Sequence, residues 1–553
     1  MSPSYNLPLN LALPAHLADH QVMGRVVLPA VHAVAALAQA AREWDPGLPV
    51  HTTHDASFQR FITIPEGTRE MAARAALTLL DTGGAEATLM TEVAARGGAV
   101  SRLLEHVKVT FAPARPPVPP PEDETWILHG PALIVPRDKF YAELVPFGPS
   151  FQNVLSDAFL APNGALGRVG SQEPSPPGPL GSPYPLDAVF QLASAWCQRF
   201  RGVVTFPAGY RLRYIYRRAL ATRQYFGRVL PVGQKDEDHL FDVWLHDLKG
   251  EVVECVQGLI MSDLSRGRVT PPDWVRADLD CRLPEAAPGQ VELLLLEHEA
   301  LPACASLAFS PRERHRAQKM GPRRLPGFMA VRLGLKLLAR KLDPKVRQVP
   351  SSRLDTLDRD PTRPRLPPEL GQEGYHCSAS HDRRFTLVAV ADRPVGVDVE
   401  EIAERAWRGG RLFLSPAERR LAEASPLGKE AAAVRIWSVK ECVAKLMNWE
   451  LVRAWKEVEV VEVAQDGSRL QAAGQEARAC HSSWGGHLFT CLTGLNPPDA
   501  PPKVTPPAPP ELTPEEPPEA AAAATPDPAP EEPPDEPAEA TPEEPPDEPP
   551  TPA

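Results

Sequence analysis

The chain has 553 residues, 43% of them hydrophobic, and a formal net charge of −12. Fourteen acidic residues and no basic ones lie between residues 511 and 553, so the rest of the chain is close to neutral, at about +2. This balance argues against a nucleic-acid surface, and the lack of an apolar run of about 18–20 residues argues against a membrane span.

The first region, at about 1–265, has two halves with the same pattern, at about 1–112 and 122–265. In each half a proline precedes a helical run, which is expected at 30–44 in the first half and at 186–200 in the second. Strand-like segments follow the helices, at 61–65, 106–111, 222–230, 239–246 and 250–262. One helix followed by several antiparallel strands, twice over, predicts a duplicated α+β unit.

A turn-rich stretch at 266–288 predicts a linker, and the region after it, at 289–496, mixes helices with strands. Helices are expected at 324–342 and 431–447, and strands at 385–391 and 395–400. From 497 to 553 the chain is dominated by proline, acidic residues and alanine, and the segment PEEPPDEP occurs twice. This composition predicts a disordered acidic tail, and a solubilising role is favoured over a docking role.

Two motifs in the region 289–496 bring carboxylates and ammonium groups together. In GVDVE, Asp398 and Glu400 are two residues apart and project from the same face of a strand. In WSVKECVAK, Glu441 and Lys445 share one face of a helix, and Lys440 flanks them. Neighbouring carboxylates repel unless a cation lies between them, and magnesium prefers oxygen ligands. Each motif alone also suits a solvated surface, but together they indicate a magnesium site for a diphosphate.

With Ser380-His381 and FLSPAE, these motifs resemble the larger, two-lobed type of 4′-phosphopantetheinyl transferase, which activates surfactin synthetase, over about 200 residues. The resemblance implies a pseudo-twofold α/β fold, magnesium as the cofactor and coenzyme A as the phosphopantetheine donor. The implied reaction is attack by a carrier-protein serine on the β-phosphate of coenzyme A, with Glu441, or a water on the metal, accepting the proton. The implied metal ligands are Asp398, Glu400 and Glu441, the implied catalytic residues are Glu441 and Lys445, and the implied coenzyme A contacts are Arg323, Arg324, His381, Lys440 and Lys445.

A second candidate site lies in the first region. His20 opens HQVMGRVVLP, in which Gly24 permits close backbone approach and Pro29 precedes a helix with free N–H groups. Such a place can polarise a thioester carbonyl, although a lone histidine is more often structural. Asp187 and Gln191 lie four residues apart on one face of the second helix, where an aspartate also suits the helix dipole.

Taken with FGPSFQ at 147–152, these residues resemble the dehydratase domains of polyketide and polyunsaturated fatty acid synthases, over about residues 1–265. The resemblance implies a double hotdog fold with His20 as the base and Asp187 as the acid. It also implies that the Gly24 N–H binds the thioester carbonyl and that Gln191 orients the aspartate. Elimination of water from a 3-hydroxyacyl thioester requires such a base and such a protonated acid.

The combined interpretation is a bifunctional enzyme that dehydrates 3-hydroxyacyl-carrier thioesters and loads carriers with phosphopantetheine. The carrier is expected in trans, because no LGxDSL-like motif occurs in the chain. A product-template-like cyclase and a non-catalytic hotdog that docks acyl chains remain alternatives for the first region, and a homodimer through the hotdog remains open. Eight scattered cysteines without a CxxC pair, and an N-terminus without a signal-peptide pattern, predict a cytoplasmic protein.

Overall fold

The computed structural model describes residues 3–94, 101–171, 173, 178–285, 291–358, 364–370 and 374–497. The acidic tail expected at 497–553 lies outside the described residues beyond position 497. No helix in these described ranges has the length and apolar character that crossing a membrane requires.

The first half of the N-terminal region is one helix with an antiparallel sheet around it. Helix α1 (Ala30–Trp44) begins directly after Pro29, as the sequence predicts, and buries the side chains of Val31, Val34 and Leu37. The strands around it are β1 (Ser4–Ala12), β4 (Thr52–Phe58), β6 (Glu70–Leu79), β7 (Ala85–Ala94) and β8 (Ser101–Phe111). A small sheet is formed by β2 (Gln21–Val22), β3 (Arg25–Leu28) and β5 (Ile62–Thr63).

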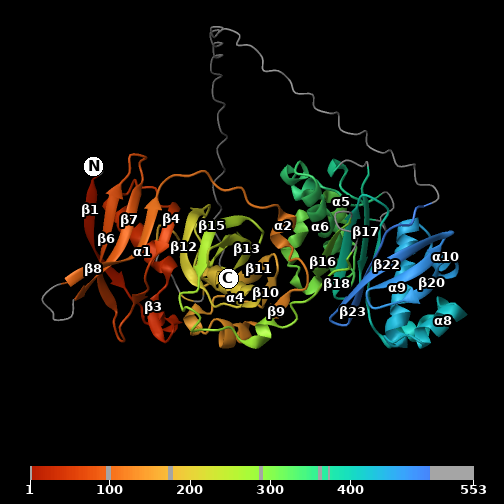
Figure 1. Ribbon diagram of the computed structural model, residues 1–553. Coiled ribbons are helices and arrows are strands. Elements are labelled where there is room, and N and C mark those ends of the chain that lie inside the picture. Colours follow the sequence, from red (N-terminus) through yellow and green to blue (C-terminus); the bar gives the residue numbers. More distant parts are fainter. Residues whose placement is uncertain are drawn as a thin grey trace, which may run out of the picture. The chain divides into compact units, whose positions relative to one another are not determined.

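The second half repeats this plan around helix α4 (Tyr184–Arg201), which Gly202 ends in the left-handed conformation. Its strands are β9 (Leu133–Val135), β10 (Ala158–Ala161), β11 (Gly164–Val169), β12 (Phe206–Ile215), β13 (Tyr225–Lys235), β14 (Asp238–Asp247) and β15 (Val252–Ser262). Strand β4 pairs with β12, so the two halves share one twelve-stranded sheet (Figure 1). The double hotdog expected from the sequence is confirmed.

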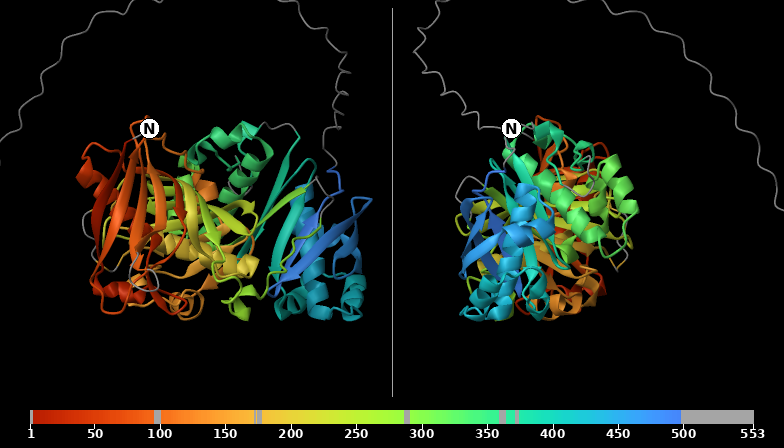
Figure 2. Two further views of the ribbon diagram at one scale, coloured as in Figure 1. Left: turned by 60° about the vertical axis from the view of Figure 1, so that its left-hand side comes forward. Right: turned by 90° about the vertical axis from the view of Figure 1, so that its right-hand side faces the viewer.

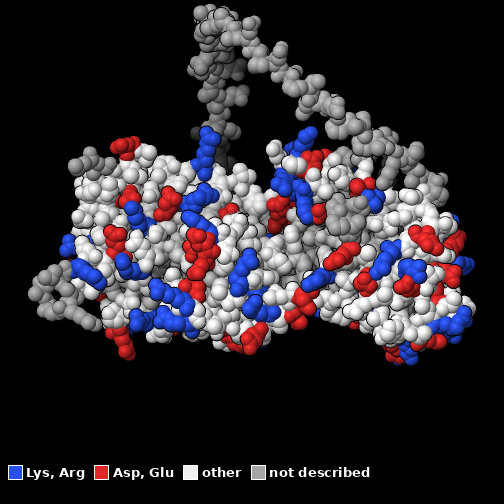
Figure 3. Space-filling model, viewed as in Figure 1, with Lys and Arg blue, Asp and Glu red and all other residues white. Residues whose placement is uncertain are grey.

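The C-terminal region has two lobes, each with a long helix on a sheet. The first lobe has α5 (Pro311–Gln318), α6 (Leu325–Leu342), β16 (Val291–Glu297), β17 (His376–His381) and β18 (Phe385–Ala391). The second has α7 (Glu404–Gly409), α8 (Pro416–Glu423), α9 (Lys429–Met447), α10 (Leu451–Glu457), β19 (Gly396–Glu401), β20 (Glu459–Val463), β21 (Gly467–Ala472), β22 (Gln475–Trp484) and β23 (His487–Leu492). Two lobes of similar construction are the fold that the sequence predicts. Basic and acidic side chains are interspersed over the face of the molecule seen in Figure 3.

Residues 122–132 contact both the second hotdog half and the first C-terminal lobe. This segment begins with the short helix α2 (Glu122–Trp126), and the Trp126 side chain, 1% exposed, belongs to one hydrophobic cluster with Phe309 and Phe328 of that lobe. The Gly130 N–H donates to the Leu295 carbonyl at 2.8 Å. The views in Figure 2 agree with this neighbourhood of α2 and α6. The N-terminal and C-terminal regions therefore share a core.

Two buried arginines hold this segment, one from each side. Arg340 of α6 is fully buried, and its guanidinium contacts both carboxylate oxygens of Asp123 at 2.9–3.2 Å. Arg228 of β13 is also fully buried, and burial lowers its pKa to about 9. The Arg228 guanidinium donates to the backbone carbonyls of Thr125, Ile127, Asn163, Ala165 and Val229. A buried guanidinium is tolerated because its donors all find acceptors.

The pair between Asp123 and Arg340 predicts a strong dependence of stability on a residue that belongs to neither candidate site. Asp123→Ala leaves the Arg340 charge buried without a counter-charge, so we expect the free energy of unfolding to fall by about 3–5 kcal/mol. Urea denaturation measures this loss. Glu404→Ala is the control, because it breaks an exposed pair with Arg408 and should cost at most about 0.5 kcal/mol. Equal losses in the two variants would contradict the shared core.

Candidate active sites

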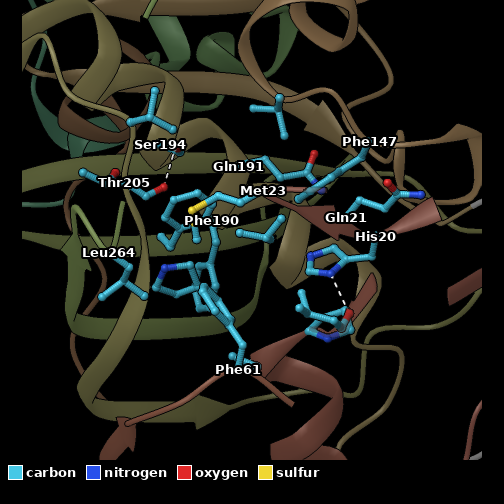
Figure 4. Close-up of a pocket in the computed structure, with 18 of the residues that line it drawn as sticks. His20, Gln21, Met23, Phe61, Phe147, Phe190, Gln191, Ser194, Thr205 and Leu264 are labelled. Carbon is cyan, nitrogen blue, oxygen red and sulfur yellow. Dashed lines mark hydrogen bonds between the residues drawn. The ribbon is translucent and has the colours of Figure 1, made fainter. Parts of the chain in front are cut away.

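The first candidate site is a pocket of about 470 Å³ between the two hotdog helices and the hairpin β2–β3. Its lining is mainly apolar, and it holds both His20 and Asp187. Figure 4 shows His20 and Gln191 toward one side of the pocket and Thr205 and Leu264 toward the other. The apolar lining residues include Val22, Leu28, Phe61, Ile62, Val107, Phe190, Phe206, Met261 and Leu264.

His20 lies between the short helix Ala15–Asp19 and β2, and its side chain is 7% exposed. Its Nδ1 lies 2.9 Å from the Val27 carbonyl oxygen (Figure 4). A carbonyl only accepts, so Nδ1 carries the proton and Nε2 of the neutral ring is the free acceptor. Burial lowers the pKa of His20, although the Asp187 charge opposes this shift. The ring lies against Phe147 and Phe151, with centroid distances of 4.4 and 5.0 Å.

Asp187 and Gln191 lie in the first turns of α4 on the face that the sequence predicts. The Gln191 Nε2 donates to Asp187 Oδ2 at 2.9 Å. Burial raises the pKa of Asp187, and the positive form of His20 and the hydrogen bond from Gln191 act in the opposite direction. Burial therefore favours the neutral form of both His20 and Asp187, one as a base and the other as an acid.

The role of Gly24 in binding the substrate carbonyl stays a prediction, and the structure gives a second reason for a glycine at this position. Gly24 and Met23 form the two-residue turn between β2 and β3, with φ of +73° and +50°. Two successive positive φ values favour a glycine, which explains the residue by backbone geometry. Among the described residues that line the pocket, Met23 is present and Gly24 is not. The spacing of the motif could not separate these two roles.

The second candidate site lies where β19 meets α9. Asp398 is 2% exposed, and its Oδ1 accepts from Ser380 Oγ at 2.8 Å and from Lys445 Nζ at 2.9 Å. Glu441 lies 3.8 Å from the same Lys445 ammonium. Glu400 accepts from Trp437 Nε1 at 3.1 Å. The strand and the helix thus bring Asp398 and Glu441 to the Lys445 ammonium, while Glu400 pairs with Trp437.

The carboxylates fit a cation, although they are not arranged as a formed metal site. In the described ranges, no three His, Cys, Asp or Glu side chains are close enough together to hold a metal ion. Asp398 Oδ2 is nevertheless buried without a hydrogen-bond partner. Burial, and then the Asp398 charge, raises the pKa of Glu400 to about 7. A cation beside Asp398 would relieve both the unpartnered oxygen and the repulsion.

Three of the implied coenzyme A contacts, two arginines and a histidine, belong to the first lobe of the C-terminal region. Arg323 and Arg324 are exposed immediately before α6, and His381 ends β17. Gly327 lies against His381, because a Cβ atom there would be 2.7 Å from the ring. Burial, and then the positive charge of Lys445, lowers the pKa of His381. The start of α6 and the carboxylate site are therefore neighbours.

Lys440 does not face this site, so its assignment to coenzyme A binding is corrected. The side chain is fully buried on another face of α9. Its Nζ donates to Glu418 at 2.8 Å, to the Phe413 carbonyl at 2.7 Å and to the Trp455 carbonyl at 3.1 Å. All three ammonium donors are therefore satisfied within the fold, and none is left for a phosphate.

The first lobe contains the same arrangement, which identifies the role of Lys440. Lys336 of α6 is fully buried, and its Nζ donates to Glu313 at 2.6 Å and to two carbonyls, those of Ala308 and Ser351. Glu313 and Glu418 each complete a capping box, with Ser310 and Ser415 respectively. The offsets along the chain nearly match, because the lysine follows the glutamate by 23 residues in the first lobe and by 22 in the second. Lys336 lies in the lobe without the carboxylate triad, so the shared pair serves the fold.

Three residues of the first site were missed by reasoning from the sequence. Phe147 and Phe151 lie against the His20 ring, and Tyr141 donates to Gln191 Oε1 at 2.8 Å. The motif FGPSFQ contains both phenylalanines, but nothing in it distinguishes a pocket wall from a core. Tyr141 belongs to no motif that the sequence analysis found.

Comparison with known proteins gives two family matches. Residues 394–492 match the 4′-phosphopantetheinyl transferase superfamily, and residues 120–271 match the polyketide synthase dehydratase N-terminal domain. No curated protein matches the chain.

Similar solved structures include dehydratases of polyketide synthesis. They include the dehydratase domain of RzxB from Pseudomonas fluorescens, at 17% identity and a TM-score of 0.38, which covers 46% of this chain and 94% of that one. The dehydratase domain from the CurF module of curacin polyketide synthase has 17% identity and a TM-score of 0.38, with coverage of 47% and 93%. The erythromycin dehydratase has 21% identity and a TM-score of 0.36, with coverage of 46% and 90%.

The buried position of Lys440 predicts that its replacement affects stability and not ligand binding. Lys440→Met leaves the Glu418 carboxylate buried without its ammonium partner, and we expect the free energy of unfolding to fall by about 3–5 kcal/mol. Lys336→Met, which removes the corresponding ammonium in the other lobe, should cost a similar amount. Chemical denaturation of both variants tests this. A Lys440→Met protein with normal stability and weakened coenzyme A binding would restore the original assignment.

Proposed function

We propose that this chain is a bifunctional enzyme of polyketide biosynthesis, because it carries both a polyketide synthase dehydratase region and a 4′-phosphopantetheinyl transferase region. The matched hotdog family is that of a dehydratase, so neither the cyclase nor the non-catalytic alternative is favoured. The observation that carries the proposal is the presence of both families in one chain, each with its own set of converging polar residues.

In the dehydratase half, we propose that His20 removes the α-proton of a 3-hydroxyacyl thioester. The Val27 carbonyl accepts the hydrogen bond from Nδ1, so the unprotonated Nε2 is free to remove the α-proton. The electron pair of that C–H bond forms the double bond, and the C3–O bond breaks as Asp187 gives its proton to the departing hydroxyl, which leaves as water. The apolar lining of the pocket suits the acyl chain of such a substrate.

In the transferase half, we propose that Asp398, Glu400 and Glu441 hold magnesium and that Glu441 accepts the proton of a carrier serine. The serine oxygen forms a bond to the β-phosphate of coenzyme A, and adenosine 3′,5′-bisphosphate leaves. We expect Lys445, whose Nζ donates to Asp398 at 2.9 Å, to neutralise charge on the diphosphate. Magnesium, when bound, would supply the positive charge that polarises the phosphate oxygens.

The proposed partners follow from these reactions. Coenzyme A reaches the transferase, with its phosphates near His381, Arg323 and Arg324, and a carrier protein supplied in trans visits both sites. We propose a cytoplasmic location, since all eight cysteines are free thiols.

The transferase proposal predicts a change of mass in a carrier. An apo-carrier domain of a polyketide synthase, incubated with coenzyme A and magnesium, should gain the mass of phosphopantetheine in a mass spectrum. Asp398→Ala should lower the rate at least about 100-fold, because the charge that holds the cation is lost. Asp392→Ala removes an exposed carboxylate paired with Arg393 and should leave the rate unchanged. Full activity in the presence of a magnesium chelator would refute the metal assignment.

The dehydratase proposal predicts a particular dependence on pH. A 3-hydroxyacyl thioester of pantetheine should yield the enoyl product, with kcat/KM high only while His20 is neutral and Asp187 is protonated. Burial lowers the pKa of His20, so the acidic limb should lie below pH 6.5, the ordinary histidine value. Burial raises the pKa of Asp187, so the alkaline limb should lie above its ordinary 3.8. His20→Ala should cost about 100-fold to 10,000-fold, and an acidic limb that survives this substitution would assign the base elsewhere.

A further inference from the structure

Tyr141 lies behind the dehydratase site and does not line its pocket. It belongs to a single π-helical turn, Phe140–Leu144, and its side chain is 4% exposed. The Phe140 ring and the Arg137 guanidinium lie 5.1 and 5.7 Å from its ring centroid. The Tyr141 hydroxyl is therefore held at one position, directed toward Gln191 of α4.

The direction of each hydrogen bond in this network is fixed by two backbone groups. At one end, the Val154 N–H can only donate, and it donates to the Tyr141 oxygen at 2.7 Å. The Tyr141 O–H is then free to donate to Gln191 Oε1 at 2.8 Å. At the other end, the Phe151 carbonyl can only accept, and it accepts from Gln191 Nε2 at 3.2 Å. The amide nitrogen of Gln191 must therefore face Asp187.

We propose that Tyr141 is a positioning residue that fixes the amide of Gln191 and thereby directs the catalytic proton to Oδ1 of Asp187. This inference rests on the proposed dehydratase function. Gln191 Nε2 donates to Oδ2 at 2.9 Å, so a proton on Oδ2 would confront another donor. The proton that Asp187 gives to the leaving hydroxyl is then carried by Oδ1, the oxygen that Gln191 does not contact.

If the oxygen and nitrogen of the Gln191 amide exchanged places, the Asp187 proton would be directed away from the substrate. Gln191 Oε1 would accept the Asp187 proton and hold it away from the substrate, while two oxygens, Oε1 and the Phe151 carbonyl, would face each other. Burial keeps Tyr141 protonated, because it raises the pKa of this hydroxyl far above its usual 10. The titratable groups that act on Asp187 are His20, Tyr141 and Tyr184. His20 is on the pocket side, so it does not take part in this chain of bonds.

The first test is Tyr141→Phe, which keeps the ring and removes the hydroxyl. We expect kcat for dehydration to fall about 10-fold, as for one lost hydrogen bond, with KM nearly unchanged. The alkaline limb of the kcat profile should move to higher pH, because the bond from Gln191 no longer favours the Asp187 carboxylate. Tyr210→Phe is the matched control, because this tyrosine is also buried. Its hydroxyl lies 2.8 Å from the Thr53 hydroxyl and takes no part in the bonds to Asp187. It should lose a similar amount of stability while keeping the wild-type kcat and profile.

A second measurement needs no substrate. Difference infrared spectra against Asp187→Asn follow the protonated carboxyl band of Asp187 with pH, and in Tyr141→Phe this band should persist to higher pH than in Tyr210→Phe. If the wild-type protein makes no enoyl product, the dehydratase function fails while the infrared titration still decides the role of Tyr141. If Tyr141→Phe does not fold, Gln191→Leu should show the same alkaline displacement. The proposal would be overturned if Asp187 titrated at the same pH in Tyr141→Phe as in the Tyr210→Phe control. The same holds for Gln191→Leu where that variant is used instead.

Discussion

Burial of charged and polar groups away from water is the constraint on which the rest of the structure depends. A guanidinium or carboxylate in the interior must find partners for its donors and acceptors, or the fold loses several kcal/mol. Arg228 satisfies this requirement entirely with backbone carbonyls, and Arg340 does so with Asp123 and with carbonyls of its own lobe. Both arginines act on residues 122–132, which makes that segment a common part of two regions with different chemistry.

The same constraint sets the chemistry of each site in a different way. In the hotdog pocket, desolvation lowers the pKa of His20 and raises that of Asp187, so a base and an acid coexist in their neutral forms. Beside β19, desolvation acts on carboxylates that also repel one another, and the pKa of Glu400 rises to about 7. The first arrangement suits proton transfer between neutral groups, whereas the second suits a cation that takes up excess negative charge.

Local repetition in the C-terminal region separates structural residues from functional ones. The pairs Lys336–Glu313 and Lys440–Glu418 have matching partners in the two lobes, whereas only the second lobe carries the carboxylate triad. A lysine next to a catalytic motif can therefore belong to the framework. In a helix, residues 440 and 441 differ by about 100° in direction, so adjacent positions in sequence face different surroundings.

The sequence by itself determined both helices of the double hotdog, the faces that carry Asp187 with Gln191 and Glu441 with Lys445, and the prolines at the helix starts. These features depend on periodicity and on local backbone preferences, which short segments express without their neighbours. Strands β6 and β7 were not predicted, because their many alanines favour no strand until the alternate side chains pack against α1.

Only the tertiary structure decided that Lys440 is buried with Glu418, that Gly24 serves a turn, that Tyr141 reaches Gln191, and that residues 122–132 join two regions. Each of these contacts links residues whose distance in space is set by packing and not by their spacing along the chain.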